Sequence, residues 1–328
     1  MNLRESKERI LQLAAGLESV FIGRKNVIRT MITAMVAQEP MLFIGPPGTA
    51  KSLLISTFCA ALGVEDGEYF EYLLTRYSEP GEILGPVDIQ KLKNGVYIRK
   101  TTGQLPEARI AFLDEIFKAN SAILNILLTL INEKKFYQDG KPVKVPLQML
   151  FAASNEIPTF GEFDALKDRF VLKMETRPVQ DDHFDELIKV GFSLDANAES
   201  RQTLRGLPDI GCNLEDFQII NNYLRETVMA RCSREVDGIF GNKEVDQLFR
   251  SLVAMIKDEE DVSITDRKLI KLAKLVLADA VVFSPREEIT PENLSILAYA
   301  GNDFGEIRRL ELHVRERLLG MGIPNEVS

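Results

Sequence analysis

The strongest constraint on this chain is the octapeptide at residues 45–52, which reads Gly-Pro-Pro-Gly-Thr-Ala-Lys-Ser. An apolar run at residues 41–44 comes directly before it and predicts a buried strand. Apolar residues at helical spacing follow it and predict a helix over residues 52–62. A glycine-bearing loop between a strand and a helix points backbone N–H groups and the positive end of the helix dipole at an anion. The octapeptide is therefore predicted to be a phosphate-binding loop.

The side chains at the end of this loop add the chemistry of a nucleotide site. Lys51 is expected to reach the β- and γ-phosphates, and the Ser52 hydroxyl to hold Mg²⁺. The strict pattern has glycine where Ala50 stands, and we expect its methyl group to be tolerated if φ is negative there. The alternative is a glycine-rich turn that binds nothing, which the Lys-Ser pair and a second motif downstream disfavour. The predicted nucleotide-binding residues of the loop are Gly45, Pro46, Pro47, Gly48, Thr49, Ala50, Lys51, Ser52 and Leu53.

The second motif, at residues 110–115, reads Ile-Ala-Phe-Leu-Asp-Glu. Four apolar residues followed by two carboxylates predict a buried strand that delivers acids to its carboxyl end, where ligands bind in open α/β sheets. Asp114 is placed to hold Mg²⁺ through water, and Glu115 to polarise the water that attacks the γ-phosphate. An acidic pair after a strand is by itself more often a solvated loop. Downstream of a phosphate-binding loop, the catalytic interpretation is favoured.

Composition restricts the remaining classes of function. With 328 residues, of which 45% are hydrophobic, the chain is long enough for about two domains. Its first residues are charged and lack the apolar core of a secretion signal, and no apolar run approaches the length of a membrane span. We therefore expect a soluble, cytoplasmic protein. The net charge of −9 argues mildly against binding to duplex DNA, although an oligomer would still be able to form a local basic channel.

Cysteine and histidine offer little material for a metal centre or a histidine-based catalytic triad. The cysteines Cys59, Cys212 and Cys232 are odd in number and lack ligand spacing, which indicates reduced thiols and supports a cytosolic location. The two histidines, His183 and His313, lie far apart in the sequence. Zinc hydrolysis and a disulfide framework are therefore disfavoured.

The order of the predicted elements indicates an α/β protein. Predicted strands lie at residues 41–44, 69–74, 110–114, 148–153 and 170–174. Helical patterns alternate with them at residues 5–20, 27–36, 52–62 and 119–132, which predicts a mostly parallel sheet with right-handed crossovers. After residue 178 only helical patterns follow, at residues 214–224, 245–256, 269–282 and 307–318, and Thr290-Pro291 starts another helix. We predict an α/β domain over residues 1–177 and a helical domain over residues 178–328.

Two stretches interrupt this alternation. Asp88–Lys100 carries Asn94-Gly95 and Lys135–Val145 carries Asp139-Gly140, and both dipeptides favour the two-residue turns of β-hairpins. We predict inserted hairpins at about residues 86–101 and 134–147. They are either decoration on the sheet or projecting elements that contact a partner or substrate, and their residues alone leave both interpretations open.

With these motifs placed, the chain resembles the AAA+ ATPases, specifically the MoxR family, and most closely its RavA-like branch. The resemblance covers nearly the whole chain, and alanine is common at position 50 in that family. It implies an AAA+ P-loop core with a parallel sheet flanked by helices, hairpins at the positions of the helix-2 insert and the pre-sensor-1 hairpin, and then a helical lid. The most specific stretches are GPPGTAKS at 45–52, LTRYSEP at 74–80, GQLPEA at 103–108, FLDEIFKA at 112–119 and AASNE at 152–156.

The resemblance implies roles for three residues beyond the two motifs. Asn155 would be sensor 1, whose amide helps Glu115 to hold the attacking water. Arg169 matches the arginine finger, which completes the site of a neighbouring subunit, since a permanently charged guanidinium suits a transferring phosphoryl group. Arg267 matches sensor 2 and would contact the γ-phosphate in cis, although the adjacent Lys268 leaves that register open. Without the resemblance, Asn155 reads as a turn former and Arg169 as a surface charge.

The segment Val20–Gly23 matches the one that encloses adenine in this family, so Phe21 and Ile22 are expected to bind the nucleotide base. The implied cofactors are ATP and Mg²⁺, and the implied activity is ATP hydrolysis. The resemblance implies that ATP hydrolysis is coupled to remodelling, assembly or activation of a protein client. It also implies that the protein works as an oligomeric ring, and a hexamer is favoured. The implied partner in trans is a von Willebrand factor A-domain protein.

Three departures from the family pattern qualify these expectations. No aromatic-hydrophobic-glycine pore loop follows the strand at 69–74, which disfavours processive unfolding. The chain is too short for the extra domain of RavA-like proteins, and it has no metal-ion-dependent adhesion domain, so such a partner is expected to be a separate polypeptide. One rival is a nucleic-acid-stimulated AAA+ motor, which the acidic net charge disfavours. The other is a nucleotide-gated scaffold with negligible turnover, which Glu115 and Arg169 disfavour.

Overall fold

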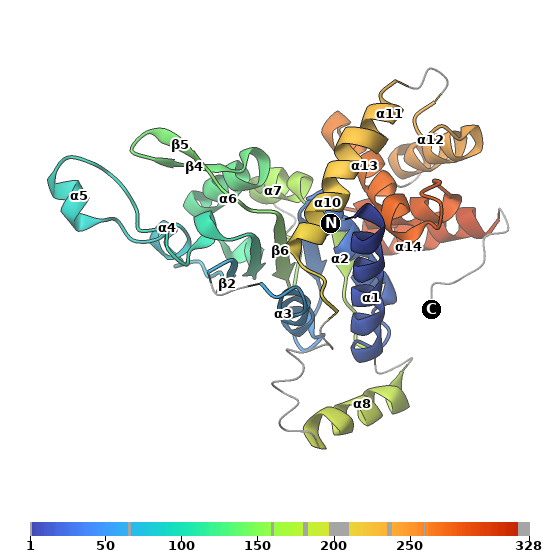
Figure 1. The fold of residues 1–328 in the computed structure, drawn as a ribbon, viewed down its shortest axis with the longest axis horizontal. Coiled ribbons are helices and arrows are strands. Elements are labelled where there is room, and N and C mark those ends of the chain that lie inside the picture. The colour runs from blue at the N-terminus through green and yellow to red at the C-terminus, as the bar shows by residue number, and fades with distance from the viewer. Residues whose placement is uncertain are drawn as a thin grey trace.

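A five-stranded parallel sheet forms the centre of the molecule, with strand order β2-β3-β6-β1-β7 (Figure 1). The computed structural model of the protein describes residues 2–64, 67–158, 161–179, 183–196, 210–234, 238–258, 260 and 262–320. Each strand lies within a residue or two of its predicted position, so the strand predictions are confirmed. The strands are β1 (Met41–Ile44), β2 (Tyr69–Leu73), β3 (Ile110–Asp114), β6 (Met149–Ser154) and β7 (Leu172–Glu175).

The central strands are buried on both faces, which explains why they read as continuous apolar runs. In β1, Met41 and Phe43 contact one hydrophobic cluster, whereas Leu42 and Ile44 contact a second one on the other face. This alternation is the period of two of a pleated strand. The first cluster includes helices α1 (Leu3–Val20), α2 (Lys25–Ala37) and α3 (Lys51–Ala61), and the second includes α6 (Ser121–Glu133) and α7 (Asp164–Arg169).

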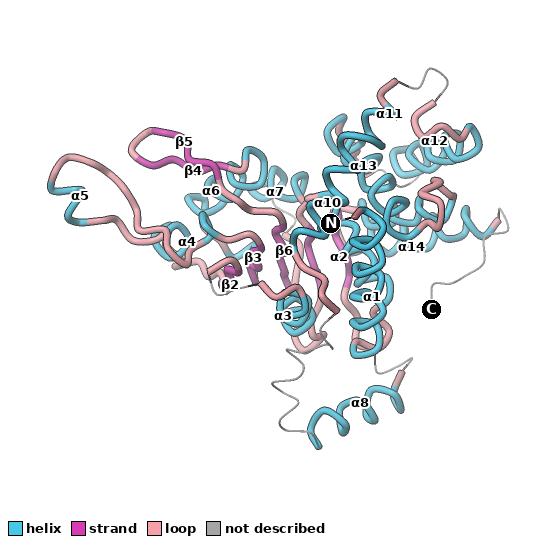
Figure 2. The backbone as a smooth tube through the Cα atoms, viewed as in Figure 1, coloured by secondary structure: helices cyan, strands magenta, loops and turns pink. Residues whose placement is uncertain are grey.

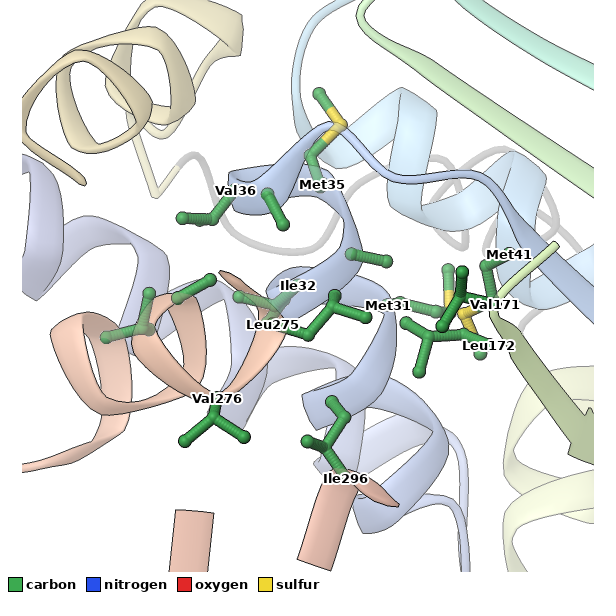
Figure 3. Close-up of a cluster of buried hydrophobic side chains, with 14 of the residues drawn as sticks. Met31, Ile32, Met35, Val36, Met41, Val171, Leu172, Leu275, Val276 and Ile296 are labelled. Atoms are coloured by element: carbon green, nitrogen blue, oxygen red, sulfur yellow. The ribbon is translucent and has the colours of Figure 1, made fainter. Parts of the chain in front are cut away.

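The helical region after β7 continues the first cluster. Helix α13 packs along α2, and α10 packs on α1. Figure 3 shows Leu275 of α13 beside Ile32 of α2, and Met31 of α2 between them and Leu172 of β7. The predicted boundary at residue 177 stays a prediction. The helices are α8 (Phe184–Ala196), α10 (Leu214–Tyr223), the π-helix η4 (Leu224–Met229), α11 (Ala230–Cys232), α12 (Lys243–Asp258), α13 (Asp266–Phe283), the 3-10 helix η5 (Pro291–Ala300) and α14 (Phe304–Leu319).

The helix after Thr290 is a 3-10 helix rather than an α-helix, although Thr290 and Asn293 form the capping box that its sequence suggests. Asn120 likewise caps α6, because its side chain accepts from the N–H groups of Ala122 and Ile123. Among the described helices, none combines the length and the apolar character that a membrane crossing requires. Shorter elements are α4 (Pro80–Leu84), α5 (Ile89–Lys93), η1 (Leu105–Glu107), η2 (Ile116–Lys118) and η3 (Gly161–Phe163).

Of the two predicted hairpins, the one at residues 134–147 is confirmed, and the one at residues 86–101 pairs antiparallel at its base but lacks the predicted two-residue turn. Strands β4 (Lys135–Gln138) and β5 (Lys141–Lys144) pair antiparallel around Asp139-Gly140, both with positive φ. The stretch 86–100 also runs out and back, with the Asp88 N–H donating to Ile98 O at 2.8 Å, but its tip is helix α5. Asp88 caps the start of that helix, and Asn94 is its C-cap, followed by Gly95 at φ 78°. Asn-Gly therefore ends a helix here, a position that it suits as well as a hairpin turn.

Candidate functional site

The phosphate-binding loop leaves β1 at the carboxyl edge of the sheet, between β6 and β7. Gly45 N–H donates to Ser154 O at 3.1 Å, and a Cβ on Gly45 would lie 2.3 Å from Thr176 O, so only glycine fits there. The Thr49 hydroxyl lies 3.1 Å from that of Thr176. These contacts hold the loop against the ends of both neighbouring strands before α3 begins at Lys51.

Lys51 is largely buried and lies inside the curve of this loop. Its Nζ donates to Gly45 O at 2.7 Å and to Pro46 O at 2.8 Å. Burial lowers the pKa of Lys51, and the nearby carboxylates of Asp114 and Glu115 oppose that shift. The structure therefore brings together the two motifs that the sequence singles out, with an ammonium group between a cradle of backbone groups and two acids.

Ala50 has a positive φ of 59°, in the left-handed region. The condition of a negative φ, under which the methyl group would be tolerated without strain, is therefore not met. An L-residue in this conformation costs about 1–2 kcal/mol because its Cβ approaches the following carbonyl oxygen. The loop carries this strain at the residue that turns the chain into α3, where a glycine would carry none.

Asp114 and Glu115 end β3, one strand away from β1. Glu115 also has a positive φ, 54°, and its N–H donates to Asp114 Oδ1 at 2.8 Å. Its Oε1 accepts from Asn155 Nδ2 at 2.5 Å and lies 3.3 Å from Lys118 Nζ. Asn155 directly follows β6, the strand between β3 and β1, so neighbouring strand ends bring these side chains together. Strained backbone of this kind persists where surrounding contacts over-determine it, commonly at functional sites.

Arg24 is a site residue that the sequence reasoning missed. Its Nη2 donates to Thr49 O at 3.3 Å and to Arg177 O at 2.8 Å, which joins the start of α2 to the phosphate-binding loop and to the segment after β7. Burial lowers the pKa of Arg24, and its charge in turn lowers the pKa of Lys51. Its place next to the segment Val20–Gly23 was the available signal, because that segment was expected to lie at the nucleotide.

The other expected nucleotide-binding residues differ in exposure. Ser52 and Leu53 open α3, and Leu53 is 46% exposed beside the loop. Ile22 is partly buried, whereas Phe21 is only 7% exposed and belongs to the hydrophobic cluster of α1 and α2. Phe21 thus anchors the segment Val20–Gly23 in the hydrophobic core, and Ile22 is the more accessible of the two side chains.

Arg169 and Arg267 lie at the opposite, amino edge of the sheet. Arg169 ends α7 just before β7, and its Nη1 donates to Asp168 Oδ2 at 3.2 Å. The other oxygen of Asp168 accepts from Thr265 Oγ1 at 3.3 Å. Because Thr265 is the N-cap of α13, the first turn that carries Arg267 lies beside α7.

The structure does not bring Arg267 to the phosphate-binding loop of its own chain, which corrects the contact expected in cis. The reason is the direction of α13 along α2. Asp279, near its end, pairs with Arg29 at the start of α2 at 2.7 Å, whereas Lys274 pairs with Glu39 beyond the end of α2 at 2.8 Å. Lys268, the other candidate for sensor 2, is buried and donates to Ser263 O and Asn302 Oδ1, both at 3.2 Å.

The residues at the carboxyl edge fit ATP with Mg²⁺. The loop offers the backbone cradle of a phosphate site, Lys51 supplies the positive charge, and the Ser52 hydroxyl and the Asp114 carboxylate are oxygen ligands of the kind that Mg²⁺ prefers. Glu115, held by Asn155, supplies a carboxylate beside them. The arrangement is suited to positioning a polyphosphate and to taking a proton from water.

The protein relatives that share sequence with this chain include the following three. Two are uncharacterised proteins of Methanocaldococcus jannaschii. One is 39% identical over 203 residues, covering 62% of this chain and 52% of the relative, and the other is 34% identical over 284 residues, covering 86% and 68%. The chaperone MoxR1 of Mycobacterium tuberculosis is 24% identical over 162 residues, covering 48% of this chain and 41% of its own length. The chain thus spans between about two fifths and two thirds of these relatives.

A solved structure from Cytophaga hutchinsonii, described as an inferred ATPase, matches the fold with a TM-score of 0.70 over 96% of both chains, at 14% sequence identity. At that identity the match supports the fold alone, a parallel α/β core followed by helices. The model of the MoxR domain found in MoxR-vWA-beta-propeller ternary systems matches residues 8–210, which include the phosphate-binding loop, Glu115, Asn155 and Arg169. This chain belongs to the MoxR family of AAA+ proteins.

Proposed function

We propose that this chain is an ATPase that uses hydrolysis of ATP to remodel, assemble or activate a protein client. The observation that carries the proposal is the 2.5 Å hydrogen bond from Asn155 to Glu115, beside the buried ammonium of Lys51. A site that only stores nucleotide needs the lysine and the loop. The held carboxylate is the additional group that water activation requires.

Each residue of the carboxyl edge has one task in this proposal. The loop and Lys51 bind and orient the phosphates, and Ser52 and Asp114 are the groups that would hold Mg²⁺. The metal, when bound, supplies charge neutralisation at the phosphate oxygens. Asn155 fixes the Glu115 carboxylate through Oε1, and Glu115 accepts the proton of the attacking water. Phe21, Ile22 and Leu53 would border the base, at the side of the loop where Arg24 ties α2 to Thr49.

The amino edge supports assembly into a closed ring. Arg169 and the helix turn of Arg267 lie beside each other and far from the loop of their own chain, so both are placed to serve a neighbour's nucleotide. Arg169 Nε is buried without a hydrogen-bond partner among the described residues, and the side chain as a whole is 20% exposed, so the contacts within the chain leave the guanidinium incompletely satisfied. Head-to-tail contacts that close by rotation generate rings. We propose a hexamer, with Arg169 as the arginine finger and Arg267 as sensor 2, both acting in trans.

The family model supplies the support for a partner. It describes MoxR domains in ternary systems with vWA and β-propeller components. We propose that a von Willebrand factor A-domain protein acts in trans with this chain in the cytoplasm, that the client is a protein, and that the chain lies near the RavA-like branch. Processive threading is not part of the proposal, because the strand at 69–74 lacks the aromatic pore loop.

The test compares Glu115→Gln with Glu215→Gln, an exposed glutamate on α10 that serves as the matched control. We expect Glu115→Gln to bind Mg-ATP normally and to lose about 10²-fold or more of kcat, because only proton acceptance is removed. Turnover at the wild-type rate in Glu115→Gln would overturn the catalytic assignment. Negligible turnover in the wild type, with ATP bound, would instead favour the scaffold.

A further inference from the structure

The two inserted elements form one projecting arm. Tyr97 N–H donates to Asp139 Oδ1 at 3.2 Å, and Arg99 N–H donates to Gln138 Oε1 at 3.1 Å, so the α5 segment and the β4–β5 hairpin are bonded to each other about 40 residues apart in sequence. Figure 2 shows both elements extending from the same end of the sheet, away from the helical region. We call residues 86–100 and 135–145 together the arm.

The arm has the opposite charge to the rest of the chain. It contains seven basic and two acidic residues, a net charge of +5, whereas the whole chain carries −9, which leaves −14 on the remainder. Five of its lysines are exposed and form no ion pair with any residue that the structure describes. These are Lys91, Lys93, Lys100, Lys141 and Lys144. The arm is therefore a concentrated cationic surface on an acidic protein, which suits an acidic ligand.

Apolar side chains are exposed among these lysines. On α5, Ile89 is 67% and Leu92 is 47% exposed, and on the hairpin Tyr137 is 55% and Val143 is 38% exposed. Ile89 and Leu92 are three residues apart and therefore share one face of the short helix. A ligand for this surface offers both carboxylates and apolar side chains, as an acidic polypeptide segment does.

The tyrosines of the arm favour a polypeptide over a nucleic acid. Single strands are held by bases that stack on free aromatic faces. In the arm, the Arg99 guanidinium lies over the Tyr97 ring at 5.7 Å, and Lys135 Nζ lies over the Tyr137 ring at 5.8 Å. One face of each ring is thus covered by a cation. The remaining features, aliphatic side chains and spaced ammonium groups, match the side chains of a peptide better than a ladder of bases.

Residues 74–78, the segment that leads into the arm and is here called its root, contact the end of β3 and the N-cap of α6. Leu74 N–H, at the end of β2, donates to Asp114 O at 2.9 Å. Ser78 O accepts from Asn120 Nδ2 at 2.7 Å, and Asn120 caps α6, the helix that leads to the hairpin. The segment that leads into residues 86–100 therefore contacts the end of β3, and the helix that leads to the hairpin begins a few residues after Glu115. We expect binding of a ligand to the arm to affect, through these contacts, the segments that position the side chains of Asp114 and Glu115.

We propose that the arm is the client-binding element and that it recognises acidic, apolar-containing polypeptide segments. This inference rests on the proposed function, because it assigns a substrate class to the same ATPase. Binding is expected to have a strong electrostatic part, since most of the cations are exposed and screened by salt. Binding to the arm is also expected to raise the rate of ATP turnover through the root described above.

The test measures fluorescence anisotropy of the full chain with a labelled peptide of Asp and Glu interrupted by Leu and Phe. We expect Lys91→Ser with Lys93→Ser, and separately Lys141→Ser with Lys144→Ser, each to weaken binding about tenfold. The matched control is Lys243→Ser with Lys257→Ser on α12, two exposed lysines outside the arm, which should bind as the wild type does. A peptide with Gln and Asn in place of Glu and Asp should not bind, and added KCl should weaken binding of the acidic peptide.

The outcomes separate this inference from the proposed function. Equal peptide binding by the arm and control variants overturns it, as does a single-stranded oligonucleotide that binds through the arm lysines when the peptide does not. Basal ATP turnover should be unchanged in both arm variants, and the acidic peptide should stimulate turnover of the wild type and the control alone. If the peptide bound through the arm but the wild type did not hydrolyse ATP, the client-binding role of the arm would be supported and the proposed ATPase function contradicted.

Discussion

The two edges of the sheet differ in the charged groups that they carry, and in the proposed function they are the two halves of one catalytic site. At the carboxyl edge, the phosphate-binding loop holds the ammonium of Lys51 near two acids, and a second ammonium, that of Lys118, pairs with Glu115. At the amino edge, Lys271 and Lys274 pair with one carboxylate, Glu39, and Arg169 lies next to them. Burial lowers the pKa of a third ammonium, that of Lys134, to about 8, and the nearby Glu39 carboxylate opposes this shift. The amino edge therefore has an excess of positive charge.

This difference explains why neither edge is sufficient alone. In the proposed function the carboxyl edge positions a polyphosphate and its metal. Among the described residues, Lys51 and Arg24 are the cations bonded to the loop, and the Arg24 guanidinium donates to backbone carbonyls. The amino edge has cations but no loop to hold phosphate. Placing the amino edge of one copy on the carboxyl edge of the next would complete both.

The largest expected effect that tests this comparison comes from Arg169. Arg169→Ala should leave ATP affinity nearly intact and lower kcat about 10³-fold, because the guanidinium stabilises charge only in the transition state. Steady-state turnover with separate nucleotide-binding titrations provides the measurement. Mixing Arg169→Ala with Glu115→Gln subunits should restore part of the activity, since some interfaces then pair an intact carboxyl edge with an intact amino edge. Activity per subunit that stays constant down to monomer-forming dilution would contradict action in trans.

A smaller effect is expected from Lys271, which contacts the proposed arginine finger. Lys271 Nζ lies 2.7 Å from Glu39 Oε2 and donates to Arg169 O at 3.5 Å, so it ties α13 to the end of α7. Lys271→Met should lower kcat about tenfold at unchanged KM, because Arg169 is then less well positioned. Lys274→Met is the matched control, since Lys274 pairs with the same glutamate at 2.8 Å without contacting Arg169. Equal effects of the two substitutions would show a purely structural role.

The carboxyl edge was largely predictable from the sequence, because Glu115 and Asn155 directly follow apolar strands and Lys51 ends the loop after another. Parallel strands place their carboxyl ends together, so Lys51, Glu115 and Asn155 had to converge once the strands were identified. The chain direction of the sheet, its flanking helices and the presence of two inserts followed from the same pattern.

The amino edge was not predictable in this way. Its contacts join residues far apart in sequence, such as Thr265 with Asp168 and Lys274 with Glu39, and helical periodicity does not state how α13 lies on α2. The structure therefore does not support the predicted contact of Arg267 with the γ-phosphate bound by its own chain. The prediction of a hairpin turn at Asn94-Gly95 was wrong for a local reason, because the same dipeptide occurs in hairpin turns and at helix ends. Here the Asp88 side chain caps the start of α5 and thereby favours the helix.

Stability against pH probes the amino edge through Lys268, which is 2% exposed. Burial lowers its pKa from 10.5 to about 8, so the unfolded chain holds this proton more tightly than the folded one. Stability should therefore rise as pH increases from about 8 towards 10.5, where the unfolded state also loses the proton. Lys268→Met should flatten this rise by an amount on the order of 1–3 kcal/mol. Urea unfolding at several pH values measures it, and an unchanged slope would contradict the shift.

The smallest expected effect lies in the strained loop of the carboxyl edge. Ala50→Gly removes the Cβ from a residue at φ 59° and should raise stability by about 0.5–1 kcal/mol, since the relief of strain exceeds the added entropy of the unfolded chain. The thermal unfolding midpoint should rise by about 1–3 °C, as measured by calorimetry without nucleotide.

Two glycines of the same loop show whether backbone conformation or space sets that effect. Gly48 has φ 83°, and a Cβ added there would meet nothing within 4 Å, so Gly48→Ala should cost about 1 kcal/mol from conformation alone. Gly45→Ala would also place a methyl group 2.3 Å from Thr176 O, and it should cost clearly more. If Ala50→Gly lowered the midpoint while Gly48→Ala left it unchanged, the positive φ at these positions would not be a source of strain. The loop at the carboxyl edge would then be held by its contacts with Thr176 and Ser154, and not at a cost in backbone energy.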